Sequence, residues 1–244
     1  MTELEHFFEM DDAKKMFVDK TCFKHGEKSG GKFIGGGLYG VVNVVCLKDE
    51  ITSADCTHVV KIIDVKADVD MSLSDAQEED RYSQLASALE VGPRYIRSYR
   101  CSAQIDGRRS DFYFIITERY DQDLASFLED VADTPNPEKR ILSLKTCIIE
   151  LIKKCVKFGV LHGDLWSPES SDSMNEGNIV LKLSTNGTVT DARLIDFDRS
   201  VIDVGSATNQ KIRQQWCNVW KLLNQNPSFR KYKLTDSYLK ELCS

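Results

Sequence analysis

Apolar and polar positions follow different periods in the two halves of the chain. In the first half, short β-branched and aromatic runs separated by turn residues predict strands at 41–46, 58–63, 95–103 and 111–117. A capping box at Ser74 to Gln77 opens a helix there. In the second half, apolar residues at steps of three and four predict helices over 137–155 and near 212–223. The pattern predicts an α+β fold.

The same pattern divides the chain into three parts. Apolar residues among charges over residues 3 to about 24 predict a helix that packs on the main body. We therefore expect an N-terminal helical extension over 1–30 and a sheet with one helix over 31–120. A reduced, mainly helical part follows over 121–244. A chain of 244 residues is long enough for two lobes that share a cleft.

Composition excludes only a few classes of function. Hydrophobic residues make up 41% of the chain and charged residues 29%, as in an ordinary globular protein. The net charge of -6 argues against a nucleic-acid partner. The eight cysteines and four histidines show neither C-x-x-C nor zinc spacing, which predicts reduced thiols and no structural metal. We expect no membrane segment and a cytoplasmic location, because no signal-peptide pattern or long apolar run occurs.

A glycine-rich stretch precedes the second predicted strand. Gly35, Gly37, Gly40 and Val42 fill the pattern G-x-G-x-x-G-x-V, with Gly36 inside it. Glycines let backbone N–H groups approach phosphate oxygens without a Cβ in the way. A Rossmann fold uses similar spacing, but its loop opens a helix, whereas this one leads into a β-branched run. The stretch predicts a phosphate-binding hairpin.

One lysine stands in the apolar run that follows. Lys61 fits an edge-strand lysine facing water, but its place after the glycine stretch is typical of the lysine that contacts the α/β-phosphates. A glutamate in the next helix would hold it. We prefer Glu78 to Glu79, because Glu78 shares a helical stripe with Tyr82 and Leu85. The alternative is that both glutamates are solvated first-turn charges.

Three polar motifs adjoin apolar runs in the second half. The first is His162-Gly163-Asp164; the others place Asn178 before a strand and Asp196 after one. Such residues are common in turns, but together they supply a base for an acceptor hydroxyl and oxygen ligands for magnesium. We assign Asp164 as the base, and Asn178 and Asp196 as metal ligands. Asn175 is the rival of Asn178.

Taken in order, these motifs resemble the protein-kinase-like superfamily over residues 31–200. The resemblance implies a two-lobed fold that binds ATP and Mg²⁺. It also implies a hinge whose backbone bonds the adenine, at Thr117, Glu118 and Tyr120, with Thr117 at the gatekeeper position.

Departures from the family pattern suggest a branch. Gly163 replaces the arginine that clamps an activation-loop phosphate, and Trp166 replaces the lysine common two residues after the base. Residues 165–177 form a longer interval than the family has, and Asp198 replaces the glycine of D-F-G. The string H-G-D-L-W is similar to that of fructosamine and aminoglycoside kinases. We therefore expect a compact atypical kinase of the minimal viral or bacterial-effector type.

Three functions are compatible with this resemblance. We favour an ATP- and magnesium-dependent serine/threonine protein kinase with a protein substrate. One alternative is a small-molecule kinase with a hydroxyl-bearing acceptor, and another is a pseudokinase that acts as a binding scaffold. An effector kinase would work in the cytosol or nucleus of a host, with a host protein as activator.

Overall fold

The structure is a computed structural model of the full chain. It describes residues 22–23, 27–36, 40–47, 56–65, 72–105, 108–166, 174–202, 208–232 and 236–244. Gly37 and all but residues 22–23 of the helix predicted over 3 to about 24 lie outside these ranges. The chain forms two compact units: unit 1 comprises Met1–Arg81 and Arg94–Arg119, and unit 2 comprises Tyr82–Pro93 and Tyr120–Ser244. The short stretch 82–93 thus belongs with the second half of the chain.

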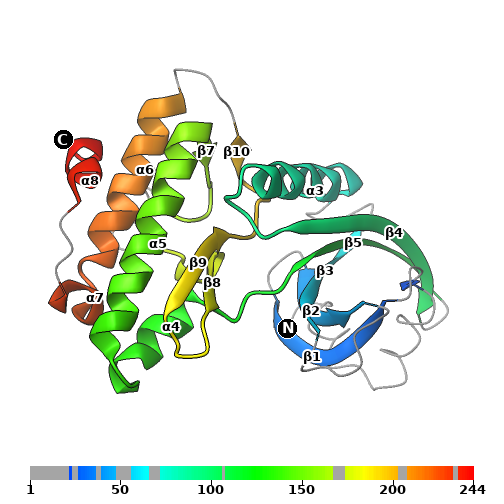
Figure 1. The fold of residues 1–244 in the computed structure, drawn as a ribbon. Coiled ribbons are helices and arrows are strands. Elements are labelled where there is room, and N and C mark those ends of the chain that lie inside the picture. Colours follow the sequence, from blue (N-terminus) through cyan, green and yellow to red (C-terminus); the bar gives the residue numbers. More distant parts are fainter. Residues whose placement is uncertain are drawn as a thin grey trace. The chain divides into compact units, whose positions relative to one another are not determined.

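Unit 1 is built on an antiparallel sheet (Figure 1). In chain order its strands are β1 (Lys28–Gly36), β2 (Gly40–Cys46), β3 (His58–Val65), β4 (Tyr95–Ile105) and β5 (Arg108–Glu118). Their order in the sheet is β1-β2-β3-β5-β4, and every neighbouring pair is antiparallel. The α+β class and the N-terminal antiparallel sheet predicted from the sequence are confirmed.

Alternate residues of β5 supply two separate cores. Phe112 and Phe114 are buried in one hydrophobic cluster on the sheet. Tyr113 and Ile115 point the other way and pack with Ala76 of helix α3 (Leu73–Ala88). This alternation is the period of two that a strand imposes on its side chains. It explains why an almost continuous apolar run forms a central strand.

Helix α3 buries a different face from the one its larger apolar residues predict. Ala76, Glu79, Asp80 and Ala86 are buried, whereas Leu85 is 37% exposed. The buried positions recur at steps of three and four, as on one side of a helix. Small residues and two acids therefore form the inner face of α3, which the apolar pattern could not indicate.

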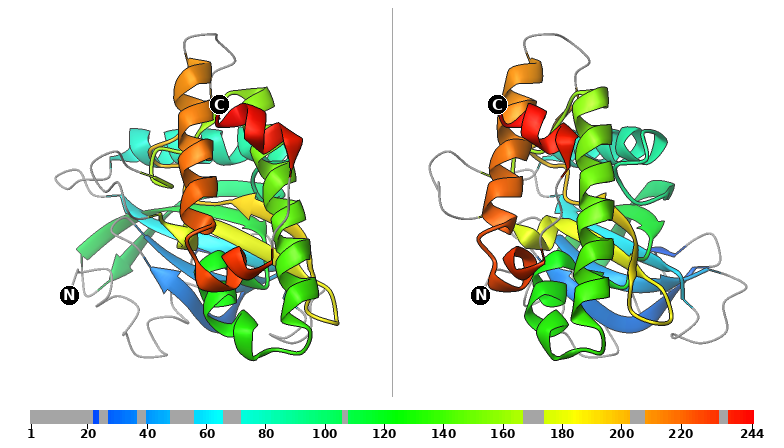
Figure 2. Two further views of the ribbon diagram at one scale, coloured as in Figure 1. Left: turned by 90° about the vertical axis from the view of Figure 1, so that its left-hand side faces the viewer. Right: turned by 60° about the vertical axis from the view of Figure 1, so that its left-hand side comes forward.

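Unit 2 combines helices with two small sheets. In chain order it contains β6 (Gln122–Asp123), α4 (Leu124–Asp130), η1 (Val131–Asp133), α5 (Pro137–Phe158), β7 (Val160–Leu161), η3 (Glu176–Asn178), β8 (Ile179–Leu183), β9 (Val189–Leu194), β10 (Val201–Ile202), α6 (Thr208–Leu223), α7 (Pro227–Lys231) and α8 (Ser237–Leu242). The sheets have the orders β6-β8-β9 and β10-β7. Figure 2 shows α5 and α6 running side by side, with α8 near α6.

The long helix α5 directs the chain to the candidate catalytic segment. It begins with a proline at its first position, as the sequence predicts. Its apolar stripe, including Ile141, Leu144 and Ile148, is fully buried. Gly159 ends it at φ 70°, a left-handed conformation that glycine adopts without a steric penalty. The short strand β7 then leads directly into His162.

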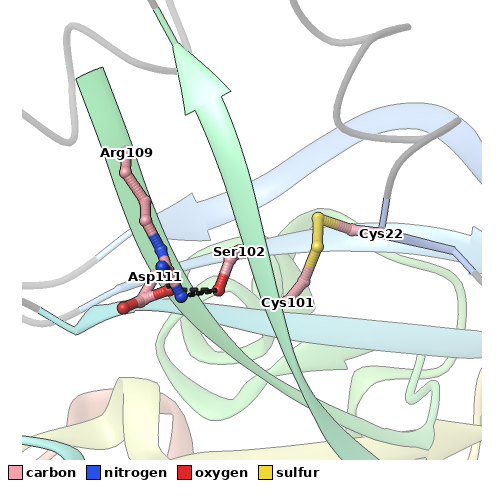
Figure 3. The surroundings of a disulfide bond; sticks show 5 residues. All are labelled: Cys22, Cys101, Ser102, Arg109 and Asp111. Carbon is pink, nitrogen blue, oxygen red and sulfur yellow. Dashed lines mark hydrogen bonds and ion pairs between the residues drawn. A yellow bond between two sulfur atoms is a disulfide. The ribbon is translucent and has the colours of Figure 1, made fainter.

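The cysteines are the largest departure from expectation. The structure has disulfides between Cys22 and Cys101, Cys46 and Cys56, and Cys217 and Cys243. Figure 3 shows the first of these, which ties the segment before β1 to β4. Near it, the Ser102 hydroxyl donates to the Asp111 carboxylate, which also forms an ion pair with Arg109.

The prediction of reduced thiols is therefore wrong for these six cysteines. The paired cysteines are 79, 10 and 26 residues apart, and none of these separations is a recognised motif spacing. Cys147 and Cys155 on α5 are free thiols, and burial raises the pKa of Cys155. Among the helices that the structure describes, none is long and apolar enough to cross a membrane.

Candidate active site

The described part of the glycine-rich stretch lies at the end of β1 and the start of β2. Gly35 pairs with Val42 and Gly36 with Val41, so the strands predicted before and after Gly37 pair with each other. A Cβ on Gly40 would lie 2.7 Å from the Ile62 carbonyl oxygen. Gly40 is thus required by the close approach of β2 to β3. The phosphate-binding role of this stretch stays a prediction.

Lys61 forms a close ion pair inside unit 1, but with Glu79 instead of Glu78. Its Nζ lies 2.6 Å from Glu79 Oε1, and the Glu79 side chain is only 3% exposed. Glu78 is 56% exposed and lies 3.9 Å from Arg81. The preference for Glu78 is therefore wrong, because the inner face of α3 carries Glu79. A buried carboxylate needs a partner to offset its desolvation, and Lys61 provides it.

A second buried acid holds α3 against the sheet. Asp80 accepts hydrogen bonds from the hydroxyls of Tyr95 (2.9 Å), Ser98 (2.8 Å) and Tyr113 (3.0 Å). Burial, with a further contribution from Asp80, raises the pKa of Tyr95 to about 12. These contacts place the neighbouring Glu79 at Lys61. The sequence gives only a weak signal for them, namely two adjacent acids and hydroxyls on distant strands.

The predicted hinge residues are held by contacts within their own units. Thr117 pairs with Val59 of β3, and the Glu118 backbone N–H donates to the Arg94 carbonyl at 2.9 Å. Tyr120 belongs to unit 2, where its hydroxyl donates to Asp191 at 2.7 Å. Burial raises the pKa of Tyr120. Adenine binding at this segment stays a prediction.

In unit 2 the main chain of His162 is clamped by a glutamine on α6. Gln215 is 2% exposed; its amide accepts from the His162 N–H at 3.2 Å and donates to the His162 carbonyl at 2.7 Å. The His162 ring is buried, and its Nε2 donates to the Ile195 carbonyl at 2.7 Å. Burial lowers the pKa of His162. This histidine is thus a neutral anchor, and the sequence gives no local signal for Gln215.

Close packing of the backbone explains the glycine at position 163. A Cβ at this position would lie 2.1 Å from the Arg199 carbonyl oxygen. The segment after Asp198 therefore rests directly on the backbone of His162-Gly163-Asp164. No larger residue fits at position 163 unless that segment moves.

Asp164 lies at the centre of a polar cluster in unit 2. Its Oδ2 accepts from the amides of Asn175 at 3.0 Å and Asn178 at 3.1 Å. Its Oδ1 lies 3.6 Å from Nη1 of Arg199. The carboxylate is 36% exposed, so it can be reached from solvent. The two rival asparagines thus both contact the predicted base, and Asn178 is the buried one.

The β8–β9 hairpin brings the two predicted metal ligands together. Ile179 pairs with Leu194, so Asn178 and Asp196 lie at the same end of the hairpin. The Ile195 N–H donates to the Asn178 carbonyl at 3.0 Å and continues this pairing. Asp196 itself has φ 64°, an uncommon conformation for a residue with a side chain. Strained residues of this kind gather at functional sites.

Asn178 and Asp196 suit a magnesium ion only if phosphate oxygens supply further ligands. Among the described residues, no group of three or more His, Cys, Asp or Glu could hold a metal. Mg²⁺ is commonly bound through one or two carboxylates together with substrate phosphates. One carboxylate, Asp196, and one amide, Asn178, fit that requirement.

Comparisons with known proteins do not assign the chain to a family. No family model matches it. No curated protein matches it either.

Proposed function

We propose that the chain is an ATP- and Mg²⁺-dependent phosphotransferase, foremost a serine/threonine protein kinase. The observation that carries the proposal is the cluster in unit 2, where Asp164 contacts Asn178 and the hairpin brings Asn178 and Asp196 to one end. An acid beside two oxygen donors is what phosphoryl transfer requires of a protein. In this proposal the fold is protein-kinase-like, with unit 1 as its N-terminal lobe and unit 2 as its C-terminal lobe.

Each residue has a defined task under this proposal. Asp164 takes the proton of the acceptor hydroxyl. Asn178 and Asp196 would hold Mg²⁺, which neutralises charge on the phosphate oxygens when bound. Lys61, fixed by Glu79, binds phosphate oxygens in unit 1. Asn175 and Asn178 orient the Asp164 carboxylate through their amide donors.

A second candidate is a small-molecule kinase. Trp166, two residues after the base, bridges to Met174 and is half-buried against the core of unit 2. An indole at this position suits a compact acceptor better than it suits the charge of a peptide substrate. The two candidates share the chemistry and differ only in the acceptor.

The test uses γ-labelled ATP, Mg²⁺ and a cell lysate whose protein and metabolite fractions are analysed separately. We expect label in the protein fraction with the wild-type chain. Asp164→Asn should lower the rate about 10²–10⁴-fold, and Asp196→Asn should also abolish labelling. The exposed Asp133→Asn on η1 is the matched control.

Each other outcome has a definite meaning. Label confined to metabolites supports the second candidate. Equal labelling by wild type and both variants, with urea unfolding unchanged, contradicts the proposal and leaves a binding scaffold as the function.

A further inference from the structure

Arg199 is held at the candidate base by its own main chain. Its carbonyl oxygen lies where a Cβ of residue 163 would stand, so only glycine there permits this approach. Its guanidinium extends back to the catalytic triplet, with Nη1 3.6 Å from Asp164 Oδ1 and Nε 4.0 Å from Asp198 Oδ2. The backbone fixes the residue, and the side chain reaches the carboxylate.

The side chain remains accessible despite these ion pairs. Arg199 is 58% exposed, and both separations exceed the 2.7–2.9 Å of a charge-assisted hydrogen bond. Exposed pairs of this kind contribute little to folding. A contribution of these ion pairs to stability therefore does not explain why an arginine stands at position 199.

The charges around Asp164 suggest instead that Arg199 acts in the reaction. The segment that carries Arg199 also carries the carboxylates of Asp196 and Asp198, and Trp166 supplies no charge. Among the described residues, Arg199 is the cationic side chain within ion-pair distance of Asp164. Phosphoryl transfer requires positive charge beside the oxygens of the phosphoryl group as it passes from ATP to the acceptor. A hydroxyl bound to Asp164 would receive that group beside Arg199.

We infer that Arg199 is a further catalytic residue, whose guanidinium binds the oxygens of the phosphoryl group during its transfer to the acceptor held by Asp164. This inference rests on the proposed phosphotransferase function. The bond from the acceptor oxygen to phosphorus forms while the bond from phosphorus to the β-phosphate oxygen breaks. The hydroxyl proton passes to Asp164, the electron pair leaves with ADP, and Arg199 stays protonated throughout.

The experiment compares the full-length wild type with Arg199→Met, Arg199→Lys and Arg199→Ala. The substrates are Mg·ATP and the lysate fraction that the wild type labels. Arg230→Met, an exposed arginine on α7, is the matched control. Loss of one charge-stabilising donor typically lowers kcat about 10²–10³-fold, which we expect for Arg199→Met, with little change in KM for ATP. Arg199→Lys should retain part of the rate.

Two further measurements separate catalysis from folding. The urea midpoint of Arg199→Met should equal that of the wild type. Added guanidinium ion should restore part of the activity of Arg199→Ala, since a free cation can fill the space of the missing group. Rescue of activity by guanidinium, with the stability of Arg199→Ala equal to that of the wild type, points to a role of the cation in the reaction.

Several outcomes overturn the inference. Wild-type kcat in Arg199→Met is one, and a higher kcat is another, because it makes Arg199 a clamp that neutralises the base. A raised KM for ATP at unchanged kcat makes it a nucleotide-binding residue. In each of these cases Asp164→Asn still abolishes labelling, whereas an active Asp164→Asn variant shows that the proposed function itself has failed.

Discussion

Two cation and carboxylate pairs, one in each unit, differ in almost every physical respect. In unit 1, Lys61 and Glu79 lie 2.6 Å apart, with the Glu79 side chain 3% exposed. In unit 2, Arg199 and Asp164 lie 3.6 Å apart and both remain substantially exposed. The buried pair is locked by burial of its carboxylate, and the exposed pair is loose.

The difference indicates which pair can take part in chemistry directly. A buried charge that loses its partner is strongly destabilising, so the buried pair has to remain intact. An exposed pair contributes about 0–1 kcal/mol, so its members can change partners at little cost. Lys61 is thus positioned by Glu79, whereas the side chains of Asp164 and Arg199 can change partners at little cost.

The largest expected effect comes from breaking the buried pair. Lys61→Met leaves Glu79 buried without its ammonium partner, which should lower the free energy of unfolding by about 3–5 kcal/mol. Urea unfolding measures it. The double variant Lys61→Met with Glu79→Leu should recover much of the loss, because no charge is then left buried. A single variant that costs less than about 1 kcal/mol would contradict the buried character of this pair.

Gly163→Ala tests the backbone contact that positions Arg199. The new Cβ would lie 2.1 Å from the Arg199 carbonyl oxygen, so the segment has to shift. We expect a loss of about 1–3 kcal/mol in urea unfolding. Gly35→Ala is the matched control, since among the described residues no atom lies within 4 Å of its Cβ position. Equal stability of the two variants would show that the contact is not tight.

The hydroxyl groups that donate to Asp80 help to hold α3, and with it Glu79, in place; removing one of them tests this role. Burial raises the pKa of Tyr95 from 10.0 to about 12, so the folded state favours the neutral phenol. This contribution is complete below pH 10 and is lost as the pH rises through about 12. Unfolding free energy measured between these values should therefore fall less steeply in Tyr95→Phe. Identical slopes would exclude a role for this phenol.

The smallest effects belong to the exposed charges. Glu78→Gln and Arg199→Met should each change the free energy of unfolding by no more than about 0.5–1 kcal/mol. Thermal and urea unfolding of both variants provide the measurement. A loss of several kcal/mol in Glu78→Gln would restore Glu78 as the partner of Lys61.

Sequence reasoning predicted the strands beside the candidate site residues, because their signal is local. Asp164, Asn178 and Asp196 each stand next to an apolar run that forms a strand, so the hairpin pairing of those strands brings two of them together. It failed for Glu79, because the buried face of α3 is set by contacts with β3 and β5. The buried face of α3 includes Ala76 and Asp80, so no stripe of large apolar residues marks it in the sequence.

Contacts between residues that are far apart in the sequence could not be predicted from local patterns. Gln215 reaches His162 from a helix more than fifty residues later, and a lone glutamine in an amphipathic helix suggests nothing. Arg199 is local to the predicted Asp196 triplet, yet its contact with Asp164 depends on how that segment folds back over Gly163. The kinase-like motif supplies no position for such an arginine.

The three disulfides have a consequence for how the protein is prepared. Eight cysteines can pair completely in 105 ways, and this fold uses three particular bonds and leaves Cys147 and Cys155 free. Bonds of this kind are kept only when no strong reductant is present. Dithiothreitol, a customary additive in phosphotransfer assays, would convert the chain into a different covalent species. Activity should therefore be measured on material made and kept without reductant, with the thiol count verified by mass before any rate is compared.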